Sequence, residues 1–172
     1  MLTTEWLTLR QLLDSDVQEI FLLRSDTSIN KYLDRQPCKT LNDALEFIQK
    51  IRNNSFTYWA IAQKESEKLV GTICLFDVSE ELEKCEIGYE LLAEFQGKGI
   101  MREAAKKIIE YSVETLGVRT IDAYTHKDNI SSTHLLQQLE FKSIDSGFQQ
   151  NSDLILFRLS VAPLFQRNEE SE

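Results

Sequence analysis

The chain has 172 residues, of which 42% are hydrophobic and 27% are charged, and its formal net charge is −9. This length suits one compact domain, and the composition is typical of a globular protein and not of a disordered one. Net negative charge disfavours nucleic acid as a partner, because phosphate backbones bind basic surfaces. No apolar run approaches the ~20 residues that span a bilayer, and no signal-peptide pattern opens the chain. We therefore expect a cytoplasmic protein with no membrane partner. Three cysteines without a Cys-x-x-Cys pair argue against a disulfide framework.

The first third of the chain predicts one strand and two helices. Residues 7–10 alternate between apolar and polar side chains, as a short strand does. Asp14 or Ser15 can cap a first helix, and Thr40 with Asp43 resembles a capping box that opens a second. The second helix carries an apolar stripe at helical spacing: Leu41, Leu45, Ile48 and Ile51.

The rest of the chain switches to strand periodicity, interrupted by two helices. Three strands, close enough in sequence to form an antiparallel meander, are predicted at 58–62, 69–76 and 85–92. The longest helix is predicted at 97–116, with Gly117 as its C-terminal cap. The remaining elements are a strand at 120–126, a helix that Asp128 or Asn129 caps and that ends near Leu139, and strands at 141–144 and 154–159.

The order of these elements, βααβββαβαββ, predicts the fold class. Helices mixed into a largely antiparallel sheet define a mixed α/β, or α+β, protein. We therefore expect one domain over residues 1–165, with a central sheet of about seven strands flanked by about four helices. A polar tail at 166–172 follows it.

A glycine-containing turn before the longest helix is the strongest candidate site. It reads Gln96-Gly97-Lys98-Gly99-Ile100-Met101-Arg102. Helix N-termini carry unpaired N–H groups and partial positive charge, and glycines let an anion approach them closely. From residue 96 to residue 107, four basic residues and one acid give a local charge of +3. These features predict an anion site, although a plain helix start with solvated lysines fits the segment equally well.

Two common phosphate-binding loops do not match this turn. A P-loop needs Lys-Ser or Lys-Thr around its last glycine, but Gly99 is followed by Ile100. A dinucleotide fingerprint needs a third glycine, where Arg102 stands, and an early parallel βαβ unit. Both readings are therefore disfavoured.

Two motifs carry a resemblance to a known family. Gln96-x-x-Gly99-x-Met101 resembles the Gln/Arg-x-x-Gly-x-Gly/Ala signature of the GNAT superfamily of acyl-CoA N-acyltransferases. The run 86–99 is similar to the branch that acetylates ribosomal-protein N-termini, and Asn129-x-x-Ser132 with the Leu-Glu-Phe that ends at Phe141 resembles a second segment of that branch. Two motifs at the right separation, on the right elements, carry more weight than one.

The resemblance implies a fold and a set of residues that bind acetyl-CoA. The middle strands of a GNAT sheet splay apart, and the pantetheine arm would pair in the gap with the backbone of Leu91, Leu92 and Ala93. The pyrophosphate would lie on Gln96, Gly97, Lys98, Gly99, Ile100, Met101 and Arg102. Asn129 would hydrogen-bond the pantetheine. Its residue type also suits a helix cap, but Asp128 offers another cap, so we favour the cofactor contact.

The implied reaction is transfer of an acetyl group from acetyl-CoA to a primary amine, by direct attack in a ternary complex. The amine must lose a proton and the departing thiolate must gain one. Many relatives use a tyrosine on the last helix as the acid, but Leu136 stands at that position, and Ser132 matches the serine that serves in the resembling branch. A helical serine more often bonds its own backbone.

Two glutamates are candidates for the group that accepts the proton of the amine. Glu86 and Glu90 alternate onto one face of a strand, where burial can raise the pKa of a carboxyl group. Glu86 matches the acidic position of the family better. His126 and His134 are other proton carriers, and without a matching carboxylate or cysteine pattern they predict no metal site.

Several alternatives stay open at this point. Met101 stands where the family has a small residue next to the phosphate, and the missing tyrosine leaves room for a non-catalytic acyl-CoA sensor or interaction module. The acceptor is a protein N-terminus or a small amine, contacted by variable segments at 25–57 and 143–153. Aromatic residues that could line its pocket are Tyr32, Phe56 and Phe148. A homodimer is also left open.

Overall fold

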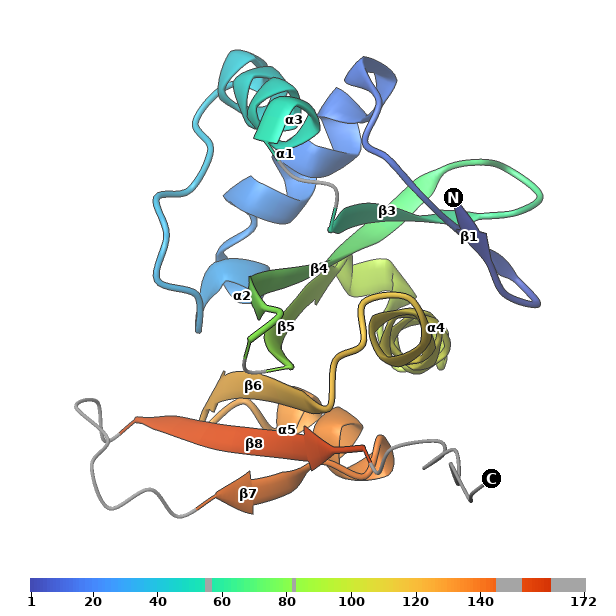
Figure 1. Ribbon diagram of the computed structural model, residues 1–172. Coiled ribbons are helices and arrows are strands. Elements are labelled where there is room, and N and C mark those ends of the chain that lie inside the picture. The colour runs from blue at the N-terminus through green and yellow to red at the C-terminus, as the bar shows by residue number, and fades with distance from the viewer. Residues whose placement is uncertain (55–56, 82, 145–152, 162–172) are drawn as a thin grey trace, which may run out of the picture.

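One sheet with helices on both faces makes up the protein (Figure 1). The computed structural model describes residues 1–54, 57–81, 83–144 and 153–161. Within these residues, the sheet has eight strands in the order β1-β2-β3-β4-β5-β6-β8-β7. The strands are β1 (Leu2–Thr3), β2 (Leu7–Arg10), β3 (Tyr58–Gln63), β4 (Leu69–Ser79), β5 (Lys84–Leu91), β6 (Thr120–His126), β7 (Lys142–Ile144) and β8 (Leu154–Ser160). The helices are α1 (Val17–Ser25), α2 (Thr27–Asn30), α3 (Leu41–Asn54), α4 (Ile100–Glu114) and α5 (Ile130–Gln138), with 3-10 turns at Asp14–Asp16 and Ala93–Phe95.

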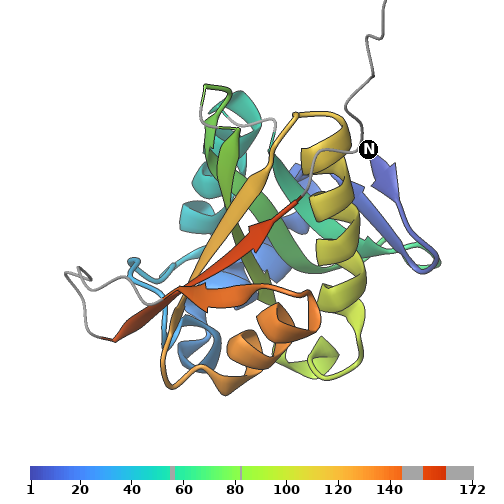
Figure 2. The same cartoon turned by 60° about the horizontal axis from the view of Figure 1, so that its bottom comes forward.

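Two hydrophobic clusters lie on the two faces of this sheet, because successive strand residues point to opposite faces. On β3, Trp59 and Ile61 join the cluster that α4 and α5 cover, whereas Ala60 joins the cluster under α1 and α3. Figure 2 shows α4 and α5 in front of the sheet and the helices of the first third of the chain behind it. None of the helices in the described residues is long and apolar enough to cross a membrane.

The sheet splits between β5 and β6, which pair in parallel. Their register covers only Lys84↔Thr120, Cys85↔Ile121 and Glu86↔Asp122. β5 then continues along β4 to Leu91, while β6 continues along β8 to His126. The second half of each strand therefore turns a backbone edge toward the split, as a splayed sheet requires.

A buried ionic cluster closes the narrow end of this split. Asp122 is fully buried at the last β5–β6 pair, and its carboxylate accepts hydrogen bonds from Arg158 on β8 at 2.7 and 2.8 Å. Lys84 on β5 also contacts it at 2.8 Å. Burial alone would raise the pKa of Asp122, but the hydrogen bonds from Arg158 and Lys84 outweigh burial and lower it. The cluster thus links three neighbouring strands where the split begins.

The predicted class, the order of the main elements and the splayed sheet are confirmed, with differences at the edges. The sheet gains β1, and the short helix α2 forms where Asp26 caps it by accepting from the N–H groups of Ser28 and Ile29. The longest helix starts at Ile100 and not at residue 97, because Gly97 and Gly99 have φ of 72° and 80°. An α-helix has no place for these left-handed conformations. The predicted tail at 166–172 lies outside the described residues.

Candidate active site

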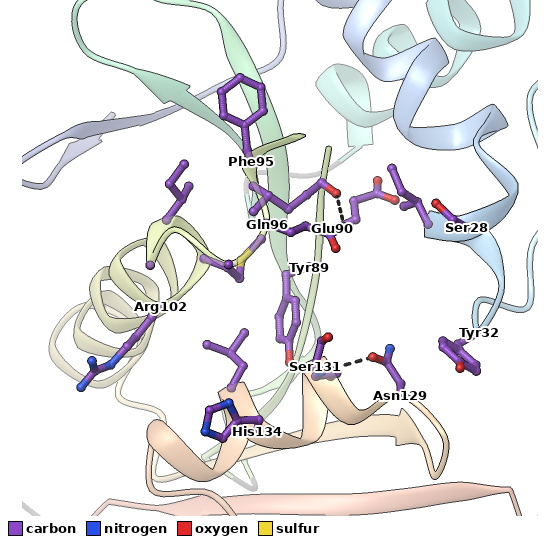
Figure 3. A pocket seen from close by; sticks show the side chains of 18 of the residues that line it. Ser28, Tyr32, Tyr89, Glu90, Phe95, Gln96, Arg102, Asn129, Ser131 and His134 are labelled. Carbon is purple, nitrogen blue, oxygen red and sulfur yellow. Dashed lines mark hydrogen bonds between the residues drawn. The ribbon is translucent and has the colours of Figure 1, made fainter. Parts of the chain in front are cut away.

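A cavity of about 640 Å³ lies at the open end of the split between β5 and β6. Its walls come from four parts of the chain: the end of β5, the turn before α4 with the first turn of α4, the helix α5 with its cap, and α2 with the residues after it. Figure 3 shows side chains from these parts converging on one space. The cavity therefore lies where the sequence predicted a cofactor site, and it also reaches the early helices.

The backbone of β5 turns toward the cavity at Leu91. The N–H of Leu92 donates to the carbonyl of Val70 on β4 at 2.9 Å. Because strand amides alternate in direction, the N–H and C=O of Leu91 point the other way, into the split. The C=O of Leu91 also accepts from Nε2 of Gln96 at 3.0 Å. Leu91 thus offers the edge that an extended ligand needs, whereas the amide of Leu92 is already used.

The start of α4 has the geometry of an anion site. Its N-cap is Gly99, which offers no side-chain cap, and the first helical hydrogen bond runs from the Glu103 N–H to the Gly99 carbonyl at 3.0 Å. A Cβ atom built on Gly97 or Gly99 meets nothing within 4 Å, so the space above both residues is open. Free N–H groups beside open space are what a phosphate group requires.

Charges around this turn favour an anion. The carboxylate of Glu103 is turned to the N-terminal hairpin, where it accepts from the Trp6 N–H at 2.9 Å and from the Thr4 hydroxyl. Lys107 pairs with Glu110 at 2.9 Å. Arg102 lines the cavity, is exposed, and extends from α4 in Figure 3. The acid of this segment is therefore engaged elsewhere, which leaves the positive charge at the mouth of the cavity.

Met101 fits this site without filling it. Its side chain is only 8% exposed and belongs to the hydrophobic cluster under α4, although the residue still lines the cavity. A helical side chain that points into the core leaves its own N–H accessible at the helix start. The large residue is thus compatible with a phosphate at this turn.

The N-terminal cap of α5 is Asn129 and not Asp128. The sequence favoured a cofactor contact for Asn129 because Asp128 could serve as the cap, and that reason does not hold. Oδ1 of Asn129 accepts from the Ser132 N–H at 3.1 Å. The residue also lines the cavity. An amide has two N–H donors besides its oxygen, so capping and a contact to a ligand are compatible.

A hydroxyl pair spans the cavity between β5 and α5. Oη of Tyr89 lies 2.9 Å from Oγ of Ser132, and both residues line the cavity. Figure 3 shows Tyr89 directed from β5 at the first turn of α5. Leu136, the position at which the sequence resemblance led us to look for a tyrosine, is fully buried in the hydrophobic core.

Of the two candidate glutamates, only Glu90 lines the cavity. It is 8% exposed and pairs with Nη2 of Arg35 at 2.5 Å, while Thr72 donates to its other oxygen at 3.1 Å. Glu86 lies four residues away, toward the closed end of the split. Burial, followed by the charge of Asp77, raises the pKa of Glu86. The raised pKa therefore supports Glu86 as the base, as the sequence predicted, but the position in the cavity favours Glu90.

Residues after α2 close the far end of the cavity. The ring of Tyr32 stacks on His126 of β6, with centroids 4.9 Å apart, and its hydroxyl donates to the Asp128 carbonyl at 3.1 Å. Ser28, Ile29, Tyr32 and Leu33 all line this end. Of the aromatic residues proposed for an acceptor pocket, Tyr32 is in place, and Phe56 and Phe148 lie outside the described residues.

The structure thus gathers most of the predicted site residues and leaves four outside the cavity lining. Leu92, Ala93, Lys98 and Glu86 are the four. Leu92 is held in the core and Ala93 begins a 3-10 turn. His134 lines the cavity, whereas His126 only stacks on the residue that closes it. Tyr89 and Arg35 were missed, because no local pattern indicates contacts across 43 and 55 residues.

Comparisons with known proteins bear on the family and the fold of the chain. Residues 7–142 match the family model described as an acetyltransferase (GNAT) domain. The uncharacterised N-acetyltransferase p20 of Bacillus licheniformis is 32% identical over 145 residues, which cover 82% of each chain. The putative ribosomal N-acetyltransferase YdaF of Bacillus subtilis is 33% identical over 73 residues, 42% of this chain and 40% of that protein. A solved GNAT-family acetyltransferase from Bacillus anthracis has the same fold, with a TM-score of 0.79, 19% identity and coverage of 92% and 96%.

Proposed function

The chain belongs to the GNAT acetyltransferase family, and from this premise we propose that it moves an acetyl group from acetyl-CoA to a primary amine. The observation that supports this most is the cavity at the split, which has an uncapped helix start at one end and a buried carboxylate at the other. The donor would enter along β5, and the amine would enter past α2. Both would meet at the Tyr89–Ser132 pair, where direct attack in a ternary complex takes place.

The residues of the cavity divide into three roles in this proposal. Gly97, Gly99 and the first N–H groups of α4 hold the pyrophosphate, and Leu91 with Asn129 holds the pantetheine arm. Ser132 faces the departing sulfur as the acid. The salt bridge of Glu90 with Arg35 lies at the acceptor end, where the carboxylate can orient an amine.

The base is the role for which the two glutamates compete. Glu86 has the raised pKa, and Glu90 has the place in the cavity. We assign Glu90 to the amine, because a general base must come within hydrogen-bond reach of the proton that it accepts, directly or through one water. Glu86 stays the alternative.

The first experiment is calorimetric titration of the protein with acetyl-CoA and with a nicotinamide dinucleotide as a control. We expect saturable binding of acetyl-CoA alone. A mass-shift screen then adds acetyl-CoA to spermidine, amino acids, aminoglycosides and peptides with free N-termini. A gain of one acetyl group on one class of amine identifies the acceptor. We expect peptide N-termini, because the chain resembles the ribosomal-protein branch.

The two measurements separate the outcomes. No acetyl-CoA binding would overturn the proposed donor. Binding without acetyl transfer to any amine would instead favour the sensor or interaction module, because the cavity would then hold acyl-CoA without using it.

A further inference from the structure

We propose that Tyr89 is a positioning residue for the transfer step: its phenol donates a hydrogen bond to Oγ of Ser132 and turns the serine O–H toward the departing sulfur. This inference rests on the proposed function. It concerns a residue on β5 that lies outside the signature from Gln96 to Met101 and that only the tertiary structure brings to α5.

The geometry comes from the split in the sheet. The pairing of β5 with β6 ends at Glu86. Tyr89 lies three residues further along β5, in the part of the strand that faces the open split, and its side chain can therefore reach α5. Its hydroxyl crosses to Ser132 over 2.9 Å. The ring itself packs on the hydrophobic cluster beneath α4 and α5. A rigid ring anchored in the core therefore fixes the position of the phenol oxygen.

Ser132 does not use its hydroxyl as helical serines commonly do. Such a serine usually bonds the carbonyl three or four residues earlier. Here the carbonyl of Asp128 accepts from Tyr32, and the carbonyl of Asn129 accepts from the Thr133 N–H. Within the described residues, the hydrogen bond of Oγ is the one to Tyr89. The side chain of Ser132 is thus held across the cavity and not against its own helix.

The direction of the hydrogen bond follows from acidity. A hydroxyl has one donor and two acceptor positions, and a phenol is a stronger acid than an aliphatic alcohol. Tyr89 is therefore the better donor and Ser132 the better acceptor. Burial raises the pKa of Tyr89 to about 12, so the phenol keeps its proton at neutral pH. The proton of Ser132 is then free to point into the cavity.

This arrangement makes a weak acid useful. The amine nitrogen forms the C–N bond with the acetyl carbon, and the C–S bond breaks with its electron pair on sulfur. The proton that nitrogen loses passes to Glu90 or to water. The sulfur takes the proton of the Ser132 hydroxyl and becomes a thiol, and the serine oxygen recovers a proton from water. During the break, the serine O–H donates to the sulfur, and the bond from Tyr89 strengthens that donation, because linked hydrogen bonds polarise one another.

The test is a double-mutant cycle of Tyr89→Phe and Ser132→Ala, with kcat and KM measured for acetyl-CoA and for the acceptor found in the screen. Tyr89→Phe keeps the ring and removes only the hydroxyl. We expect kcat to fall about threefold to tenfold, which is the usual effect of one neutral hydrogen bond, with both KM values unchanged. In the Ser132→Ala background, the same change should have no further effect on kcat.

A matched control is Tyr111→Phe. Tyr111 packs edge-on against Trp59 with ring centroids 5.5 Å apart, and it is outside the cavity lining. Loss of its hydroxyl should leave kcat at the wild-type value. The Tyr89→Phe defect should also be the same from pH 6 to pH 9, because the phenol does not ionise in that range.

Three results would overturn the inference while the wild-type enzyme still turns over. They are a Tyr89→Phe variant with wild-type kcat, an equal fall in kcat in both Ser132 backgrounds, and a defect seen only in KM. The equal fall would mean that the hydroxyl acts on the fold and not through Ser132. A wild-type protein without turnover would instead contradict the proposed function, so the two failures are distinguishable.

Discussion

The two ends of the cavity are built in different ways. The proposed cofactor end comes mainly from one continuous stretch, β5 to α4, whose glycines, helix start and charges lie within residues 91–102, and α5 adds Asn129 to it. The acceptor end joins α2 and the residues after it to β5 and β6, through Arg35 with Glu90 and Tyr32 with His126. In the proposed function, a local motif therefore predicts the donor, whereas long-range contacts shape the acceptor end, and we expect the two ends to respond separately to mutation.

The sharpest test of the cofactor end is Gly99→Asp. A Cβ here has open space, so the carboxylate would enter the phosphate site and repel the anion. We expect the affinity for acetyl-CoA to fall by about 100-fold or more, since like charges in contact cost several kcal/mol, while the fold is retained. Titration calorimetry measures the affinity, and circular dichroism checks the fold.

Gly117→Asp is the matched control for this substitution. Gly117 also has positive φ, 69°, and also has open space around its Cβ position, but it follows the C-terminal end of α4. The strain of a left-handed non-glycine residue is therefore the same in both variants. Equal loss of acetyl-CoA affinity in the two would show that strain, and not charge, explains the effect and would move the phosphate site elsewhere.

Ser132→Ala tests the point where the two ends meet. We expect kcat to fall about 10- to 100-fold, which is at or below the lower end of what an acid contributes, with little change in the affinity for acetyl-CoA. Steady-state kinetics on the identified acceptor gives both values. Ser131→Ala removes the neighbouring hydroxyl, which also lines the cavity, and should be neutral. An unchanged kcat in Ser132→Ala would remove this serine from the mechanism.

Glu90→Gln tests the acceptor end, with Glu86→Gln beside it. The first change removes a charge from the cavity and nearly keeps the shape, but an amide has a single acceptor oxygen and can serve Arg35 or Thr72, not both. We expect kcat/KM for the acceptor to fall about tenfold, with acetyl-CoA affinity unchanged. The second changes a glutamate of the same strand outside the cavity and should have little effect. The reverse result would return the role of base to Glu86, as the sequence alone suggested.

Asp122→Asn affects the closed end of the split, on which both cavity ends depend. Because the folded protein lowers the pKa of Asp122, the ionised carboxylate stabilises the fold above its ordinary pKa of 3.8, and this stabilisation is lost as pH falls through the lower folded value. We expect the variant to lose about 1–3 kcal/mol of unfolding free energy at pH 7. Urea unfolding at pH 7, 5 and 3.5 should show that the difference in unfolding free energy between the wild type and the variant narrows only at the lowest pH. A gap that is independent of pH would mean that shape, not charge, makes Asp122 stabilising.

The sequence by itself determined the class of the fold and the order of its main elements, and it predicted the cofactor end. Helical and strand periods are local, and the signature from Gln96 to Met101 lies on one turn, so both can be read without knowing what packs against them. The helix start was misplaced by three residues, because nothing in the pattern shows that Gly97 and Gly99 adopt positive φ. The resemblance to a family supplied the splayed strands, and the register of β5 and β6 confirmed them.

The tertiary structure alone decided how the cavity is completed. It placed Glu90 rather than Glu86 on the cavity wall, made Asn129 the cap of α5, and brought Tyr89 to Ser132. Glutamates four residues apart on one strand face look equivalent in sequence. Whether either one meets a ligand depends on where the neighbouring strand leaves, and Asp122 fixes that point through contacts with two other strands.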